Sequence, residues 1–321
     1  MNKVKGSKIL VTGGAGFIGS YIAEELLKEG ADVVVYDNLI RGRKENIMSP
    51  DKIEFVEGDI RDYGKLNNLM KDIDYVFHEA AVAVRRCLKY PEESIDVNIK
   101  GSFNVFKSCV ENKVKKIIFA SSASVYGNTI YSPMNEEHPK NPISYYCVSK
   151  LACEHYLRVF AKQGLKNISF RYMNVYGPRQ SVDAFYTSVI INFLNEIRNG
   201  RPPVIHGDGS QTFDFVHVRD VARANVMALK SDITDEVFNL GGEEVVSIKQ
   251  LAEMIIELTG SNLKPVYQPE KLVLVKKRVG DITKIKKMLG FEPTIKFRDG
   301  LKEVIEDFNR QPEFYLGGKT D

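Results

Sequence analysis

The stretch "TGGAGFIGS" runs from Thr12 to Ser20 and spaces three glycines, Gly13, Gly16 and Gly19, between a short apolar run and an amphipathic segment. The amphipathic segment, from 17 to about 30, repeats apolar residues at helical spacing and ends on a glycine. Glycines let a backbone turn tightly and approach a diphosphate, whose charge is stabilised by a helix N-terminus. The stretch therefore predicts a strand, a turn and a helix that together bind a diphosphate.

A carboxylate follows at the position that a dinucleotide site requires. Asp37 ends the next apolar run, 18 residues after Gly19. Its carboxylate would accept hydrogen bonds from the adenosine ribose and repel a 2′-phosphate, which favours NAD over NADP. Arg41, Arg43 and Lys44 come next; they could attract a phosphate or form an ordinary solvated loop. We predict NAD as the cofactor.

Apolar strand-like runs recur along the first half of the chain, each followed by a helix-like segment. The runs are "KILVTGG", "DVVVYD", "IEFVEGD", "DYVFHEA", "KKIIFASS" and "NISFRYMN". Continuous apolar strands separated by helices are typical of a parallel sheet that is covered on both faces. The sequence therefore predicts an α/β fold with a doubly wound parallel (Rossmann) sheet.

The pattern changes after Tyr176. Helices are predicted at 186–198, 248–258 and 281–289, and a strand at Val237. We expect a dinucleotide-binding domain of residues 1–176 with about 214–241, and a smaller, interrupted α/β substrate domain of 177–213 and 242–321. The last residues, "FYLGGKTD", are expected to be a loose tail.

Composition limits the classes of function. The 321 residues include 45 Lys+Arg and 42 Asp+Glu, and the net charge of +3 gives no reason to expect a nucleic-acid or anionic-membrane partner. No apolar run is long enough for a membrane span, so a cytoplasmic protein is expected. No metal site is expected, because the five histidines share no spacing and the cysteines lack CxxC spacing; these are Cys87, Cys109, Cys147 and Cys153.

Tyr146 and Lys150, in "ISYYCVSK" (143–150), stand four residues apart in a predicted helix. Side chains at this spacing share one helix face, so the phenol and the ammonium can enter one pocket or belong to an ordinary packed face. The dinucleotide signal nearby favours the pocket. A phenol has a pKa near 10, and acting as a base at neutral pH needs a decrease of about 3 units.

The glycine stretch is followed in order by "ASSASVYG" (120–127), by Tyr146 with Lys150 and by "RYMNVYGPRQ" (171–180). With these motifs the chain resembles the extended short-chain dehydrogenase/reductases, and within them the UDP-hexose 4-epimerases, from about residue 8 to 308. The resemblance implies that bound NAD takes a hydride from carbon 4 of the sugar and returns it to the opposite face of the 4-keto intermediate.

The resemblance also implies catalytic roles. Tyr146 would remove the proton from the 4-hydroxyl, with its pKa lowered by Lys150 and the positive nicotinamide ring. Ser122 would assist through its hydroxyl, with Ser121 beside it. The two serines could instead cap the end of their strand.

Further site residues follow from the same resemblance, and some of them could be core packing instead: Ala80, Ala81, Asn98, Tyr172, Asn174, Val189 and Phe193. Asp59 could simply form a turn, and Asn98 could be a relay or a structural residue. The cofactor set implied is Gly13, Gly16, Phe17, Ile18, Gly19, Asp37, Asn38, Asp59, Ile60, Ala80, Ala81, Ser121, Tyr146, Lys150 and Tyr172. The substrate set is Ser122 and Tyr146 at the sugar, Asn174 and Lys271 at the diphosphate, Val189 and Phe193 at the uracil, and Arg278 at the sugar or the diphosphate.

The residues before "VYG" separate reaction types in related enzymes. Sugar 4,6-dehydratases carry an Asp-Glu pair there and nucleotide-sugar decarboxylases usually a glutamate, whereas this chain has Ala123 and Ser124. Without a carboxylic acid, elimination lacks its proton donor and acceptor. Epimerisation is therefore favoured, and "NVYGPRQ…FYTSVI" resembles the branch that acts on UDP-GlcNAc and UDP-GalNAc.

Two departures from the family pattern leave alternatives open. Phe213 stands where relatives carry a diphosphate-binding arginine, and Lys271 stands at the place of a second one. Arg278 stands where a small residue is expected beside an N-acetyl sugar. It could bind the carboxylate of an acidic UDP-sugar, such as a uronic acid or a lactyl-bearing N-acetyl sugar, or it could replace the arginine missing at Phe213.

Two further expectations concern the whole protein. A catalytically silent NAD-binding sensor is an alternative to an enzyme, because fold alone does not fix function. The resemblance implies a homodimer through helices around 96–110 and 144–160.

Overall fold

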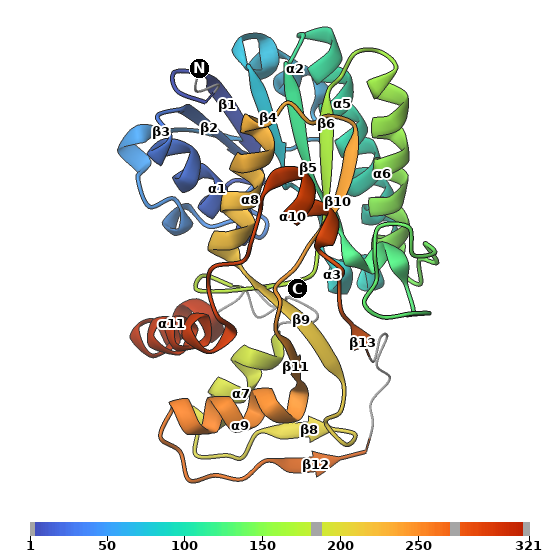
Figure 1. The fold of residues 1–321 in the computed structure, drawn as a ribbon. Helices are drawn as coiled ribbons and strands as arrows, with labels where there is room; N and C mark the ends of the chain where they lie inside the picture. The colour runs from blue at the N-terminus through green and yellow to red at the C-terminus, as the bar shows by residue number, and fades with distance from the viewer. Residues whose placement is uncertain (1–3, 181–187, 270–276, 317–321) are drawn as a thin grey trace.

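The computed structural model describes residues 4–180, 188–269 and 277–316. Its larger unit contains a seven-stranded sheet in the order β10-β6-β5-β4-β1-β2-β3, and every neighbouring pair is parallel (Figure 1). The strand order reverses around β1, and ligands bind outside the carboxyl ends of the strands at such a point. The strands are β1 (Lys8–Thr12), β2 (Asp32–Asp37), β3 (Ile53–Glu57), β4 (Tyr75–His78), β5 (Lys116–Ser122), β6 (Asn167–Tyr172) and β10 (Glu236–Leu240).

Helices cover both faces of this sheet (Figure 1). One apolar cluster joins the sheet to α1 (Phe17–Lys28) and α8 (Val218–Lys230). A second joins it to α2 (Tyr63–Leu69), α5 (Ser102–Glu111) and α6 (Tyr145–Ala161). The predicted doubly wound α/β fold is confirmed. Short segments connect the layers: η1 (Lys44–Asn46), η2 (Pro50–Lys52), η3 (Met70–Asp72), α3 (Val84–Lys89), α4 (Pro91–Glu93), the π-helical η4 (Ser94–Gly101) and η5 (Ala123–Tyr126).

A smaller unit, in the lower part of Figure 1, has its own sheets and core. One sheet has the order β11-β9-β13 with β7 also paired to β9, and a second pairs β12 with β8. The strands are β7 (Asn174–Tyr176), β8 (Val204–His206), β9 (Thr212–His217), β11 (Val245–Ser247), β12 (Val266–Gln268) and β13 (Lys277–Arg278). Their helices are α7 (Ser188–Arg198), α9 (Ile248–Leu258), α11 (Phe297–Arg310) and α12 (Pro312–Leu316).

The elements do not follow the predicted domain boundaries everywhere. β7 and β9 pair with each other in the smaller sheet, although the boundaries at 176 and 214 put β7 and most of β9 in the larger domain. Conversely, α10 (Thr283–Leu289) packs beside β10, and its Ile285 joins the core of the larger unit. The chain therefore passes between the two units more often than the predicted domain boundaries indicate.

The predicted loose tail is wrong for its first residues. Phe314, Tyr315 and Leu316 end α12. The Tyr315 side chain is buried, and its hydroxyl accepts a hydrogen bond from the Arg179 backbone N–H at 3.0 Å. An aromatic anchor in the smaller core therefore fixes this part of the tail, while 317–321 lie outside the described residues.

Candidate active site

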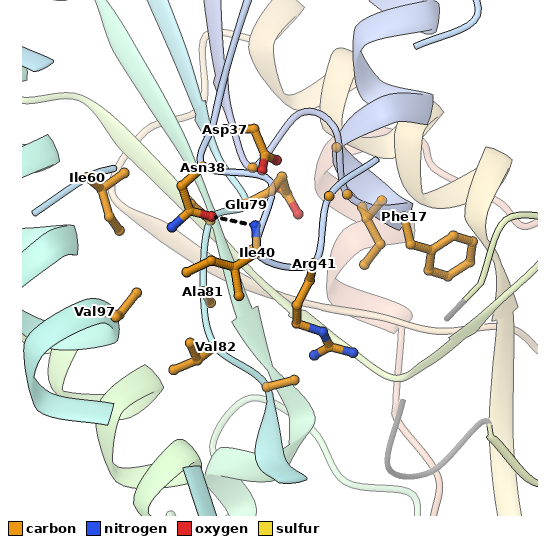
Figure 2. A pocket seen from close by; sticks show the side chains of 18 of the residues that line it. Phe17, Asp37, Asn38, Ile40, Arg41, Ile60, Glu79, Ala81, Val82 and Val97 are labelled. Carbon is orange, nitrogen blue, oxygen red and sulfur yellow. Dashed lines mark hydrogen bonds between the residues drawn. The ribbon is translucent and has the colours of Figure 1, made fainter. Parts of the chain in front are cut away.

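A cavity of about 380 Å³ opens at the carboxyl ends of β1, β2, β4, β5 and β6. The sheet order brings these ends together, so residues far apart in the sequence share one wall (Figure 2). Most of the predicted cofactor residues line the cavity: Gly13, Gly16, Phe17, Ile18, Gly19, Asp37, Asn38, Ile60, Ala80, Ala81, Ser121, Tyr146, Lys150 and Tyr172.

The glycine turn lets a neighbouring backbone and a ligand approach its main chain closely. Gly13 has a φ of +71°, and a Cβ there would lie 2.6 Å from the Ala80 backbone nitrogen, so only glycine fits. α1 then begins after Gly16, whose residue type offers no side chain to cap the first N–H groups of the helix. Those N–H groups are donors at the positive end of the helix dipole. This end of the cavity suits a diphosphate.

Asp37 lies at the end of β2, buried beside the glycine turn. Its carboxylate accepts hydrogen bonds from the backbone N–H of Ala15 at 3.1 Å and of Leu39 at 2.8 Å. Burial raises the pKa of this carboxyl, although both hydrogen bonds lower it. The backbone therefore fixes the carboxylate at the cavity wall, where it can meet ribose hydroxyls.

The basic residues after Asp37 divide between two surroundings. Arg41 lines the cavity (Figure 2). Arg43 donates to the Phe314 carbonyl at 2.7 Å and stacks on the Phe314 ring, and Lys44 lies over the Phe55 ring. Two of the three basic side chains are thus engaged with other parts of the protein.

Asp59 does not line the cavity, although Gly58 and Ile60 on either side of it do. Its carboxylate accepts from the Arg61 backbone N–H at 2.8 Å, from the Arg61 guanidinium, and from Asn38 at 2.8 Å. These bonds, first among them that of the Arg61 side chain, lower the pKa of Asp59 to about 2. The turn-forming interpretation of Asp59 fits this geometry.

Tyr146 and Lys150 both reach the cavity from α6, on one helix face as their spacing predicts. The Lys150 ammonium donates to the Ala120 carbonyl at 2.7 Å and lies 5.8 Å from the centre of the Tyr146 ring. Burial raises the pKa of the Tyr146 phenol, and the hydrogen bond with Ser122 only partly offsets this. The expected lowering of the phenol pKa by Lys150 is therefore absent from the protein's own contacts.

The two predicted serines have different partners. Ser121 lines the cavity and donates to the Glu154 carboxylate at 2.5 Å. Ser122 accepts from the Ser124 backbone N–H at 3.2 Å and from the Ser124 hydroxyl at 2.9 Å, besides its bond with Tyr146. Ser122 thus caps η5, as the capping interpretation predicts, and it also lowers the pKa of the nearby Tyr146 phenol.

Glu79 lines the same cavity and was not singled out in the sequence. It follows β4 directly, between His78 and Ala80, and its carboxylate accepts a hydrogen bond from the Tyr172 hydroxyl at 3.1 Å. The available signal was its place at the carboxyl end of a parallel strand, where site residues gather. Other cavity residues were also missed, among them Arg61, Arg86 and Gln180.

Comparison with known protein families shows to which family the chain belongs. Residues 9–241 match the model of the NAD dependent epimerase/dehydratase family. The chain belongs to this family. NAD is accordingly its cofactor, and the residues fit it: the glycine turn leaves room for a diphosphate, and the Asp37 carboxylate at the cavity wall could accept hydrogen bonds from a ribose.

Similar proteins within the family act on UDP-sugars. A crystal structure of the UDP-glucose 4-epimerase of Thermotoga maritima with UDP-glucose is 38% identical, with a TM-score of 0.89 over 95% of this chain and 100% of the other. The UDP-N-acetylglucosamine 4-epimerase of Methanobrevibacter ruminantium M1, in complex with UDP-N-acetylmuramic acid, is 36% identical, with a TM-score of 0.91 over 96% and 99%. A UDP-N-acetyl-α-D-glucosaminuronate decarboxylase of Bacillus cytotoxicus is 35% identical over 94% of this chain and 97% of its own.

The residues predicted at the diphosphate and the uracil, where the structure describes them, do not line the cofactor cavity of this epimerase-family chain, and neither does Arg278. Asn174 is buried, and its amide donates to the Asp214 carbonyl at 2.8 Å. Phe193 lies in the core of the smaller unit, with Val189 packed against that core. Arg278 is buried and is the register partner of Phe213 in the β13–β9 pair. Lys271 lies outside the described residues.

Asn98 is structural: its amide accepts from the Val82 N–H at 2.8 Å and donates to the Val82 carbonyl at 3.0 Å. Among the described residues, no group of three His, Cys, Asp or Glu side chains could hold a metal ion. Nor does any helix in the described part of the chain have the length and apolar character needed to cross a membrane.

Proposed function

We propose that this NAD-dependent UDP-sugar 4-epimerase homologue interconverts UDP-GlcNAc and UDP-GalNAc. The observation that carries the proposal is the meeting of Tyr146 and Lys150 in the cofactor cavity, with Ser122 near enough to the phenol to lower its pKa. Ala123 and Ser124 add no carboxylic acid at the position where dehydratases and decarboxylases of this family carry one. The site thus has the groups for moving one proton, and lacks that acid for elimination.

The chain's own residues would handle the proton of the sugar 4-hydroxyl. Tyr146 accepts it, and Ser122 bridges the phenol and the sugar oxygen. NAD, when bound, accepts the hydride of carbon 4 and returns it. Because the protein's own groups raise the pKa of Tyr146, the positive charge of the oxidised cofactor is the remaining source of the required decrease.

The smaller unit would hold the nucleotide in place while the sugar rotates to present its opposite face to the cofactor. Asn174, Lys271, Val189 and Phe193 keep their proposed roles at the diphosphate and the uracil. The amide of Asn174 has further hydrogen-bonding capacity beyond its single bond to Asp214, which supports a second role.

An acidic UDP-sugar is the second candidate substrate, and Arg278 favours it. Register partners in a parallel pair project to the same side, so Arg278 stands beside Phe213, where relatives carry a diphosphate arginine. The M. ruminantium relative was solved with UDP-N-acetylmuramic acid, which bears a lactyl carboxylate. Arg278 would pair either with such a carboxylate or with the diphosphate.

The test is direct. The purified chain is incubated with UDP-GlcNAc, UDP-glucose and an acidic UDP-sugar, and the 4-epimers are followed by NMR. We expect turnover to be greatest with UDP-GlcNAc, and Arg278→Ser to lower kcat/KM equally on neutral and acidic sugars if Arg278 binds the diphosphate. A selective loss on the acidic sugar would assign Arg278 to a carboxylate. Inertness toward every UDP-sugar would favour the NAD-binding sensor, and release of CO₂ would favour a decarboxylase.

We also propose a homodimer in the cytoplasm. Exposed apolar side chains gather on η4, α5 and α6, which supports pairing of these helices between two copies. They are Ile95, Phe103, Tyr145, Val148, Tyr156 and Val159. All four cysteines are buried free thiols, in keeping with a reducing compartment. Sedimentation equilibrium tests the dimer, and a monomer at micromolar concentration would contradict it.

A further inference from the structure

Glu79 occupies a position in the cofactor cavity that the proposed reaction leaves without a role. Its side chain is half-buried and faces the cavity that Tyr146 and Lys150 also line (Figure 2 shows Glu79). It is the carboxylate of β4's carboxyl end, beside the glycine turn, where a Gly13 Cβ would meet the Glu79 and Ala80 backbone. A carboxylate at this position lies beside the place where the cofactor is expected to bind.

The hydrogen bonds around Glu79 assign it an accepting role. The Asn225 amide, on α8, donates to the Tyr172 hydroxyl at 2.9 Å and to the Val221 carbonyl at 2.8 Å. The phenol has one proton and two acceptors at 3.1 Å, the Asn225 amide oxygen and the Glu79 carboxylate, and an ionised carboxylate is the stronger acceptor. Tyr172 and Asn225 are both buried. The network thus presents a donor to the carboxylate and stabilises its ionised form.

The charges that face Glu79 come from two elements. α6 contributes the Lys150 ammonium and the Tyr146 phenol, and β6 contributes the Tyr172 phenol. His78, next in sequence, has its pKa lowered to about 3 by burial and remains neutral. The Lys150 ammonium is the cation that acts on Glu79, and it donates its hydrogen bond to the Ala120 carbonyl rather than to the carboxylate.

The cavity walls fix which end of the dinucleotide Glu79 meets. Asp37 marks the adenosine ribose and the glycine turn marks the diphosphate, so the nicotinamide end is left for the wall of Tyr146, Lys150 and Tyr172. Glu79 is hydrogen-bonded to that wall. The oxidised nicotinamide carries a positive charge that the reduced ring lacks. A carboxylate beside it favours the oxidised form.

We propose that Glu79 sets the redox preference of the bound cofactor, its carboxylate making the site bind NAD⁺ more tightly relative to NADH. The inference rests on the proposed function only for the position of the nicotinamide beside Tyr146. Burial raises the pKa of Glu79 to about 7, with Lys150 and the Tyr172 hydrogen bond acting in the opposite direction. The preference for NAD⁺ therefore increases as pH rises through neutrality.

The experiment measures cofactor affinity rather than turnover. The full chain is equilibrated with NAD⁺ and NADH together, and the ratio bound is measured after rapid filtration at about pH 6 and about pH 8.5, on either side of the Glu79 pKa. For the wild type we expect the NAD⁺ preference to increase on the order of tenfold with pH, the size of one charge interaction in a partly buried site. Glu79→Gln keeps the shape but not the charge, so it should show the low preference at both pH values.

The Tyr172→Phe variant tests whether the charge of Glu79, or only the hydrogen bond that positions it, sets the preference for NAD⁺. It removes the hydrogen bond to Glu79 and keeps the carboxylate, so the rise with pH should persist and move to higher pH. If Glu79→Gln matches the wild type at both pH values, or if Tyr172→Phe copies Glu79→Gln, the inference is overturned while the proposed function stands. If the wild type binds neither nucleotide, both are overturned.

Discussion

Two clusters of buried polar side chains lie at the carboxyl ends of β5 and β6, and they differ in how completely their charges are paired. In one, Arg171 makes a two-pronged contact with Glu154 at 2.7 and 3.0 Å, and also donates to the Tyr126 hydroxyl. In the other, around the cofactor cavity, Lys150 donates to a backbone carbonyl and Glu79 accepts from a phenol. The first cluster is locked, in the sense that its guanidinium and carboxylate are fully paired with each other. The second cluster keeps charges that a ligand can contact.

This difference in pairing predicts that the first cluster contributes to stability and the second to catalysis. A fully paired, buried guanidinium cannot change its partners without a large cost. A buried ammonium and a half-buried carboxylate that are not paired with each other can respond to the charge of a cofactor. Changing one cluster should therefore affect stability, and changing the other should affect activity and titration.

The largest effect is expected from Tyr146→Phe. Loss of the phenolic proton acceptor should reduce kcat for UDP-sugar epimerisation by about 10²- to 10⁴-fold, because general acid–base catalysis contributes that much. Thermal unfolding should stay close to that of the wild type. The NMR assay for 4-epimers measures the rate.

Tyr126→Phe is the matched control for that experiment. Tyr126 is also buried, and burial also raises the pKa of its hydroxyl, but it donates to Asn239 at 2.6 Å in the locked cluster. This variant should lose about 1–3 kcal/mol of unfolding free energy and retain its turnover. Equal activity losses in Tyr126→Phe and Tyr146→Phe would contradict the division between the clusters.

The second effect is on stability. Arg171→Met removes the cation from Glu154 and leaves a buried, uncompensated carboxylate, which should cost about 3–5 kcal/mol of unfolding free energy. Urea unfolding measures it. The double variant Arg171→Met with Glu154→Leu should recover much of the loss, because no charge then remains buried. A single variant as stable as the wild type would show that the pair is not what holds this edge of the sheet.

The cofactor half of the site could be predicted from the sequence because its signals are local. The glycine spacing and Asp37 lie within one strand-helix-strand unit, and in the structure the glycines and Asp37 line one cavity. Tyr146 and Lys150 likewise need only the period of a helix. Fold class followed from the same kind of local pattern, repeated along the first half of the chain.

The rest depends on contacts between distant segments. The Glu79 carboxylate accepts a hydrogen bond from Tyr172, which lies 93 residues later in the sequence, so no rule based on sequence spacing predicts this contact. Arg278 stands beside Phe213 only because β13 adds to the edge of β9. The burial of Tyr315 is not predictable from the sequence, because a single buried aromatic in a short segment leaves no periodic signal.

The smallest predicted effect is a titration of stability that belongs to the cavity cluster. Burial raises the pKa of Glu79 to about 7, above its value of about 4.3 in an unfolded chain. The folded state therefore binds this proton more tightly, so its contribution to stability is complete below about pH 4.3 and is lost as pH rises through about 7. We expect a loss of about 2 kcal/mol, less than the full shift implies because the side chain is partly exposed.

Urea unfolding across this pH range compares the wild type with Glu79→Gln, which cannot titrate. The buried carboxyl of Asp214, with its pKa also raised to about 7 by burial, gives both proteins a common slope in the same direction. The wild type should therefore lose stability more steeply than Glu79→Gln, and Asp214→Asn should reduce the slope that they share. Parallel curves for the wild type and Glu79→Gln would mean that the Glu79 carboxyl is as well solvated as in the unfolded chain, and its charge would then have little leverage on a bound nicotinamide.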